Sequence, residues 1–215
     1  HGEGHSFPTR RSSDLGLLWD TRDQEFVPTR GTFTELSFRA SPGIEQDLTF
    51  AGVTLSTAWF ASVHEDILVA ATRAVVDLQA GAVPFYEQAS FGAVGPAFGP
   101  GGGRSVRGVP LQRFAGKLKA LLNLELRARL LPFEVFGQKI NLGLIGFADT
   151  GRVWADFETF TLGGAPIDGP FSDVALGLGG GLRAQWGETF IIRGDFGYAP
   201  TEGTTGLYID VGHIF

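Results

Sequence analysis

The sequence predicts an all-β protein, and within that class a transmembrane antiparallel β-barrel. Apolar and polar residues alternate with period two over long stretches, glycine is abundant at 32 of 215 residues, and charged residues make up only 19%. No apolar run reaches the roughly 18 residues that a transmembrane helix needs, so such a helix is excluded. A barrel crosses the membrane without such a run, because only alternate residues of each strand meet lipid.

The clearest strand covers residues 117–130. Its leucines and alanines fall at every second position, while mostly lysine, arginine and glutamate fill the positions between them. A helix would place its apolar residues three and four apart, and a soluble sheet seldom keeps one face of a long strand so polar. Outer-membrane strands alternate a lipid face with a polar lumen face over roughly 9 to 11 residues. The stretch therefore predicts a membrane strand with Glu125 on its lumen face.

The next strand repeats the alternation and places Phe147 and Asp149 together on the lumen face. A carboxylate inside a barrel can remain charged near water or near a cation, but its desolvation without a partner is costly. Arg107, on the preceding loop, is the candidate partner of Asp149.

Earlier strands are predicted near residues 32–41, 47–62 and 66–80, after a first strand that ends by Asp23. Residues 82–115 then show no regular alternation and are rich in glycine, proline and phenylalanine. Loops of this length are usually functional, and long barrel loops lie on the extracellular side. We therefore expect this loop to be external or folded back into the lumen.

A second loop near residues 155–170 precedes a strand near 172–186, in which glycines alternate with apolar residues. These glycines either leave room in the lumen for an inserted loop or relieve crowding and let the sheet coil. The last hairpin ends in a strand that resembles the C-terminal recognition signal of bacterial outer-membrane proteins, with His213 as an interfacial residue rather than a ligand. Its alternating residues are Leu207, Ile209, Val211, His213 and Phe215.

Composition and motifs exclude several functional classes. The net charge of −6 gives no support for nucleic-acid binding, and the absence of cysteine removes disulfides and thiolate metal sites. No nucleophile elbow, nucleotide-binding loop or clustered metal-ligand spacing occurs. We therefore predict no catalytic residues, no cofactor and no metal in residues 16–215.

The first residues are predicted to be foreign. Residues 5–15, HSFPTRRSSDL, match the conceptual translation of a common sequencing-adapter oligonucleotide, so residues 1–15 are interpreted as a non-native leader. The alternative is a natural, polar N-terminus. About nine strands follow from Gly16 onward, whereas bacterial single-chain barrels have an even number. We therefore expect residues 16–215 to be the C-terminal portion of a barrel whose upstream part is missing.

On these residues, the chain resembles the C-terminal half of the BamA-like barrel family, also called bacterial surface antigen proteins, over residues 16–215. Three motifs carry the resemblance. They are Val106-Arg107-Gly108 in the long loop, Gly146 to Gly151 (GFADTG) in the lumen strand, and the closing stretch from Gly206 to Phe215. The family's loop motif normally ends in an aromatic residue, whereas Val109 stands there in this chain. This chain therefore departs from the family motif at that position and has no aromatic side chain there.

The resemblance implies a sixteen-stranded barrel in the bacterial outer membrane, preceded by periplasmic POTRA domains. It also implies that the long loop folds into the lumen, where Arg107 meets Asp149, Phe147 and Glu125. The implied function is non-enzymatic assembly, insertion or translocation of outer-membrane proteins, through a weak seam beside the closing strand. The implied partners are unfolded outer-membrane proteins, the lipid bilayer, and periplasmic or lipoprotein accessory subunits.

Other interpretations remain open at this point. The barrel could be a passive pore, or a secretion channel for one dedicated partner. It could also anchor a patatin-like lipase domain, as in some proteins of this resemblance, which would make the whole protein an enzyme. For Arg107 the alternative is that it only caps a surface loop.

Overall fold

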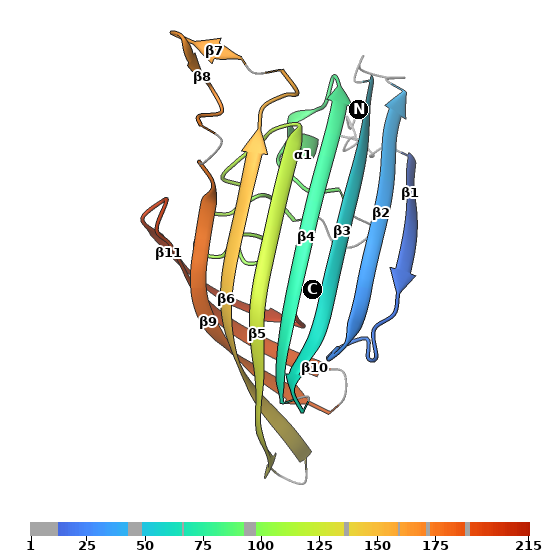
Figure 1. Ribbon diagram of the computed structural model, residues 1–215, viewed down its shortest axis with the longest axis vertical. Coiled ribbons are helices and arrows are strands. Elements are labelled where there is room, and N and C mark those ends of the chain that lie inside the picture. The colour runs from blue at the N-terminus through green and yellow to red at the C-terminus, as the bar shows by residue number, and fades with distance from the viewer. Residues whose placement is uncertain are drawn as a thin grey trace, which may run out of the picture.

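Antiparallel strands form one curved sheet in the computed structural model, which describes residues 13–42, 49–65, 67–92, 98–135, 138–158, 160–170, 173–187 and 190–215 (Figure 1). Over these residues the sheet has nine strands, and each lies beside its neighbours in the sequence. In order they are β1 (Ser13–Asp20), β2 (Gly31–Pro42), β3 (Thr49–His64), β4 (Leu68–Gly81), β5 (Leu118–Val135), β6 (Gln138–Trp154), β9 (Ala175–Trp186), β10 (Phe190–Ala199) and β11 (Thr204–Val211). The predicted fold class, part of an antiparallel transmembrane barrel, is confirmed.

Among the residues that the structure describes, one small hairpin and one short helix accompany this sheet. A small hairpin pairs β7 (Thr161–Leu162) with β8 (Ala165–Pro166), and one short helix, α1 (Phe85–Gln88), follows β4. No helix in the part of the chain that the structure describes is long and apolar enough to cross a membrane.

The two faces of the sheet have opposite chemistry. Along β10, Arg193 and Asp195 are almost fully buried on the concave face, while Ile192 and Phe196 are 44% and 54% exposed on the convex face. The other long strands follow the same rule, with charged groups inside and leucine, phenylalanine or tryptophan outside. This arrangement reverses that of a soluble sheet and matches a barrel wall with an apolar lipid face.

The closing strand ends earlier than the alternation predicts. The pattern extends it from Gly206 to Phe215, but β11 ends at Val211. Gly212 adopts φ = 83°, a left-handed conformation that glycine adopts without strain, and the chain turns there. The ring of Phe215 consequently lies on the concave side, 6.3 Å from the ring of Phe60 of β3. The closing strand, predicted to run from Gly206 to Phe215, therefore ends four residues earlier, and the resemblance of this stretch to a C-terminal recognition signal stays a prediction.

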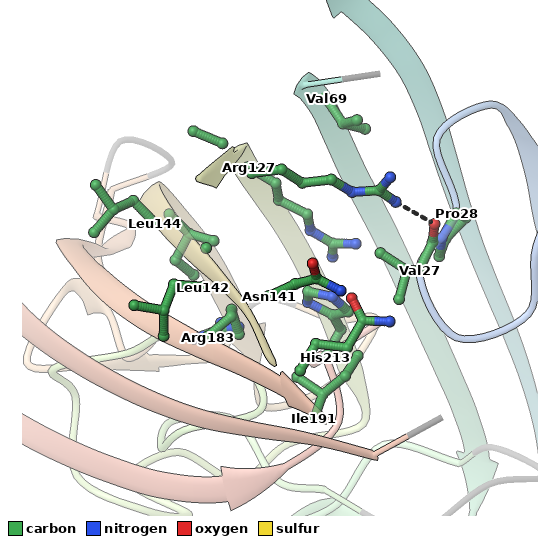
Figure 2. A pocket seen from close by; sticks show the side chains of 15 residues that line it. Val27, Pro28, Val69, Arg127, Asn141, Leu142, Leu144, Arg183, Ile191 and His213 are labelled. Atoms are coloured by element: carbon green, nitrogen blue, oxygen red, sulfur yellow. Dashed lines mark hydrogen bonds between the residues drawn. The ribbon is translucent and has the colours of Figure 1, made fainter. Parts of the chain in front are cut away.

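His213, predicted to be an interfacial residue rather than a ligand, lines a small pocket of about 50 Å³ (Figure 2). The pocket lies between the β1–β2 connection and the adjoining ends of β4, β5, β6, β9 and β10. Arg127 and Arg183 also line it, and Arg129 donates a hydrogen bond of 3.2 Å to the carbonyl oxygen of Val27. The role of His213 as an interfacial residue stays a prediction.

Residues 1–12 of the leader lie outside the described residues. Ser13 to Leu15 belong to β1 and pair with Ala40 to Phe38 of β2. The interpretation of residues 1–15 as a non-native leader stays a prediction.

We expect an arginine at Leu55 to impair membrane insertion, because Leu55 lies near the middle of β3 and faces outward, 43% exposed. An arginine at the bilayer midplane of a barrel costs roughly 2 to 4 kcal/mol. Ser56→Arg is the matched control, since it places the same charge on the concave face, opposite Glu35 of β2. Folding titrations of the full-length protein into lipid vesicles should show a loss for Leu55→Arg alone. Equal losses for both variants would contradict the assignment of the faces.

Candidate functional site

The connection between β4 and β5 folds back over the concave face of the sheet and carries the Val106-Arg107-Gly108 motif there (Figure 1). Val106 and Val109 are almost fully buried and pack in one apolar cluster with Val75 of β4 and Leu121 of β5. These two valines lie on either side of Arg107 and Gly108 and fix the motif against the wall. Val109, which stands where the family motif has an aromatic residue, therefore contributes apolar packing.

Arg107 is fully buried and lies within bonding distance of acidic side chains from neighbouring strands. Its Nε and Nη2 atoms donate to the two carboxylate oxygens of Asp149 on β6, at 2.7 and 2.9 Å. Its Nη1 atom donates to Glu125 Oε1 on β5 at 2.7 Å. The backbone N–H of Arg107 also donates to Asp149, at 3.1 Å. Such a two-pronged arginine–carboxylate pair fixes orientation as well as charge.

Phe147 and Asp195 complete the surroundings of this guanidinium. The Arg107 Cζ atom lies 3.4 Å from the ring centroid of Phe147, a cation–π geometry. Asp195 of β10 lies 3.4 Å from Arg107 Nη1, and the sequence did not suggest it as a partner. Burial disfavours the charge of Arg107, but the hydrogen bonds to Asp149 and the nearby carboxylates outweigh it and raise the pKa of the guanidinium.

Further arginines share these carboxylates. Arg183 of β9 and Arg193 of β10 contact Asp195 at 2.5 and 3.3 Å, and Arg127 contacts Glu125 at 2.8 Å. Each of these arginines and carboxylates contacts a partner of opposite sign, which offsets the cost of burying the ions. Because the carboxylates are engaged by arginines, they are poorly suited to bind a cation. Within the described residues, no group of three or more His, Asp or Glu side chains is placed to hold a metal ion.

Asn123 connects Arg107 to a second arginine. Its amide nitrogen donates to Asp149 and to the carbonyl oxygen of Ser105, both at 2.7 Å, and its oxygen accepts from Arg73 of β4. Arg73 in turn donates to the carbonyl oxygens of Arg104 and Ile214. The loop and the C-terminal residues are therefore joined to the same polar network.

Glycines of β9 and β10 make room for the loop. A Cβ atom at Gly177 would overlap the carbonyl oxygen of Arg107, and one at Gly197 would lie 2.8 Å from the carbonyl carbon of Arg107. On the loop itself, Gly108 has φ = 96°, and a Cβ there would lie 2.7 Å from the backbone nitrogen of Ala199. Of the two explanations left open for the β9 glycines, space for an inserted loop fits Gly177, whereas a Cβ at Gly179 or Gly181 would meet Phe196 or Asp195 of the wall, which fits relief of crowding.

The two glycines that bound the strand motif differ in their surroundings. A Cβ atom at Gly151 would lie 3.0 Å from Val106 Cγ2, so Gly151 belongs to the wall that receives the loop. A Cβ atom at Gly146 would meet none of the described atoms within 4 Å. Nothing in the structure explains a glycine at Gly146.

A second buried ion cluster lies on β2, β4 and β5, and sequence reasoning did not assemble it. Asp77 contacts Arg39 at 2.7 Å and Lys119 at 2.8 Å, and it accepts a hydrogen bond from Thr54 at 2.7 Å. Glu87 of α1 lies 3.4 Å from Arg39 Nε and its carbonyl oxygen accepts from Lys119. The cluster attaches the first part of the loop, including α1, to the wall.

The outward residues of the closing strand lie at the edge of the sheet. Leu207, Ile209 and Val211 are 72%, 78% and 57% exposed, and in the described part of the chain β11 pairs with β10 alone. The candidate seam is therefore an apolar edge strand, with the loop on its inner side.

We expect Gly177→Ala to displace the loop, because the added methyl group overlaps the Arg107 carbonyl oxygen. Gly146→Ala is the control, since the same methyl group meets open space among the described residues. Limited proteolysis of the full-length protein in vesicles should cut residues 98–115 faster in Gly177→Ala only. Equal protection in both variants would contradict the close contact between loop and wall.

Comparison with known proteins agrees with this architecture. A sequence model of the Omp85 superfamily domain matches residues 3–215. No curated protein sequence matches the chain. Among solved structures, the chain is similar to BamA from Haemophilus ducreyi lacking POTRA domains 1–3, with a TM-score of 0.66 and 16% sequence identity. The similarity covers 94% of this chain but 42% of the BamA chain, so the chain spans less than half of that structure. The chain belongs to the Omp85 superfamily and is part of a bacterial outer-membrane β-barrel.

Proposed function

We propose that this chain is the C-terminal barrel portion of a factor that inserts or translocates other outer-membrane proteins without catalysing a chemical reaction. The observation that carries the proposal is the burial of Arg107 of the loop motif among Glu125, Asp149 and Asp195 of the barrel wall. We call these four residues the clamp. It fixes the loop whose residues Arg104 and Gly108 contact edge strand β11.

The site of action in this proposal is the seam beside β11. An exposed strand edge offers unpaired backbone donors and acceptors, and an unfolded chain can add a strand there. The exposed side chains of Leu207 and Ile209 suit contact with lipid next to that edge. The partners we propose are unfolded outer-membrane proteins and the bilayer, together with periplasmic or lipoprotein accessory subunits.

The loop that covers the concave face of the sheet favours insertion or translocation over a passive pore. A pore needs an open, water-filled path, whereas the loop here covers the concave face with the buried residues Val106, Arg107 and Val109. The described residues also provide no catalytic arrangement that would favour an enzyme, although a lipase domain elsewhere in the whole protein would change that answer.

The full-length protein reconstituted in vesicles tests the proposal directly. We expect it to accelerate the folding of an added, urea-unfolded outer-membrane barrel, measured by the shift of the folded form on unheated gels. Vesicles without the protein are the baseline. Steady ion conductance without any acceleration of substrate folding would overturn the proposal in favour of a pore.

We expect Arg107→Ala to destabilise the barrel, because it leaves Glu125 and Asp149 buried with less compensation. Breaking a buried ion pair typically costs about 3 to 5 kcal/mol, and water entering the lumen would reduce that figure. Arg113→Ala is the matched control, since Arg113 lies in the same loop but is 54% exposed in its pair with Glu202. Urea unfolding of the full-length protein in vesicles should show the loss for Arg107→Ala alone. Equal stability of both variants would remove the clamp from the proposal.

A further inference from the structure

The inner face of β11 is attached to the loop at separate points along the strand. Near its start, Thr204 Oγ1 donates to the carbonyl oxygen of Gly108 at 2.7 Å, and the N–H of Gly108 donates to the Tyr208 hydroxyl at 3.0 Å. Further along, Asp210 accepts from Arg104 of the loop at 3.0 Å. These inward-facing residues alternate with the exposed Leu207 and Ile209.

The fit of Tyr208 depends on another glycine of the loop. A Cβ atom at Gly103 would lie 2.7 Å from Tyr208 Cδ1, so the ring occupies the space that the missing side chain leaves. Beside this contact, a cavity of about 460 Å³ lies between the loop and β11. The strand is therefore joined to the loop by a few directed contacts rather than by a continuous packed interface.

The charges at Asp210 are accessible to water, unlike those of the clamp. The Asp210 and Arg104 side chains are 34% and 43% exposed, whereas those of Arg107 and Asp149 are fully buried. Asp210 also contacts Arg193 of β10 at 3.1 Å, so it can keep one partner when the other leaves. Exposed ion pairs are held weakly because water replaces the lost contacts.

We propose that Tyr208 and Asp210 act as positioning residues that latch edge strand β11 to the loop through Gly108 and Arg104. The latch holds the seam strand in place, and its release lets β11 move while the clamp around Arg107 stays intact. This inference rests on the proposed function, in which a substrate strand is received at that seam. It assigns the loop motif a second role, control of the seam, in addition to its contact with the wall.

Hydrogen–deuterium exchange on the full-length protein in lipid nanodiscs tests the latch. Tyr208→Phe removes only the hydroxyl that binds Gly108 and keeps the ring beside Gly103, and Asp210→Asn weakens the contact with Arg104. We expect the amides of β11 to exchange faster, by up to about tenfold in the double variant, with β5 and β6 unchanged. A β11 that exchanges at the wild-type rate in the double variant would overturn the latch.

Matched controls lie on the same hairpin. Tyr198→Phe removes a hydroxyl from the outward face of β10, and Glu202→Gln weakens an exposed ion pair with Arg113 outside the latch. Both should leave β11 exchange at the wild-type rate, and a rise in β11 exchange in these controls as large as in the double variant would also overturn the latch.

The substrate-folding assay keeps the two ideas separate. Faster β11 exchange in the double variant supports the latch even where the wild-type protein fails to fold substrates, in which case the proposed function alone falls. Unchanged exchange with active wild-type protein removes the latch and leaves the proposed function standing.

Discussion

The buried guanidinium of Arg107 is the constraint on which the rest of this structure depends. An ion removed from water needs opposite charge in close contact, since an uncompensated buried charge costs several kcal/mol. Its partners Glu125, Asp149 and Asp195 come from β5, β6 and β10, so no single strand can supply them. The sheet must curve to bring these strands around one side chain, and glycines such as Gly177 let the loop backbone come close enough.

The need to pair buried charges also accounts for the many ion pairs on the concave face of the sheet. The outward positions carry the apolar residues, so lipid replaces the hydrophobic core as the environment that orders the wall. Buried ion pairs are weak evidence for stability, but they depend strongly on geometry. The clamp and the cluster around Asp77 can be satisfied in one strand register only, because a slip by one residue moves each charge to the lipid face.

The alternation of apolar and polar residues was enough to predict the strands. It also grouped Glu125, Phe147 and Asp149 on one face, because successive side chains of a strand point to opposite faces of the sheet whatever the fold. It could not reveal Asp195 as a partner, because that contact depends on how far the sheet curves between β6 and β10. The Asp77 cluster was missed for the same reason, as Asp77 of β4 contacts side chains of β2 and β5 directly and Glu87 of α1 joins them from the loop. The turn at Gly212 was not predicted, because the alternation of apolar residues continues past it. Only the backbone conformation shows the change of direction.

The loop contacts differ in strength in a way that suits a barrel with one movable strand. Breaking a fully buried pair such as Arg107 with Asp149 costs about 3 to 5 kcal/mol, whereas an exposed pair such as Arg104 with Asp210 is worth roughly 0.2 to 1 kcal/mol. A competing strand can therefore displace the ion pair between β11 and the loop long before it disturbs the clamp, while β11 keeps its pairing with β10 from Thr204 to Val211. The buried clamp and the more exposed contacts of β11 can coexist, because they use different residues of the same loop: Arg107 in the clamp, and Arg104 and Gly108 at β11.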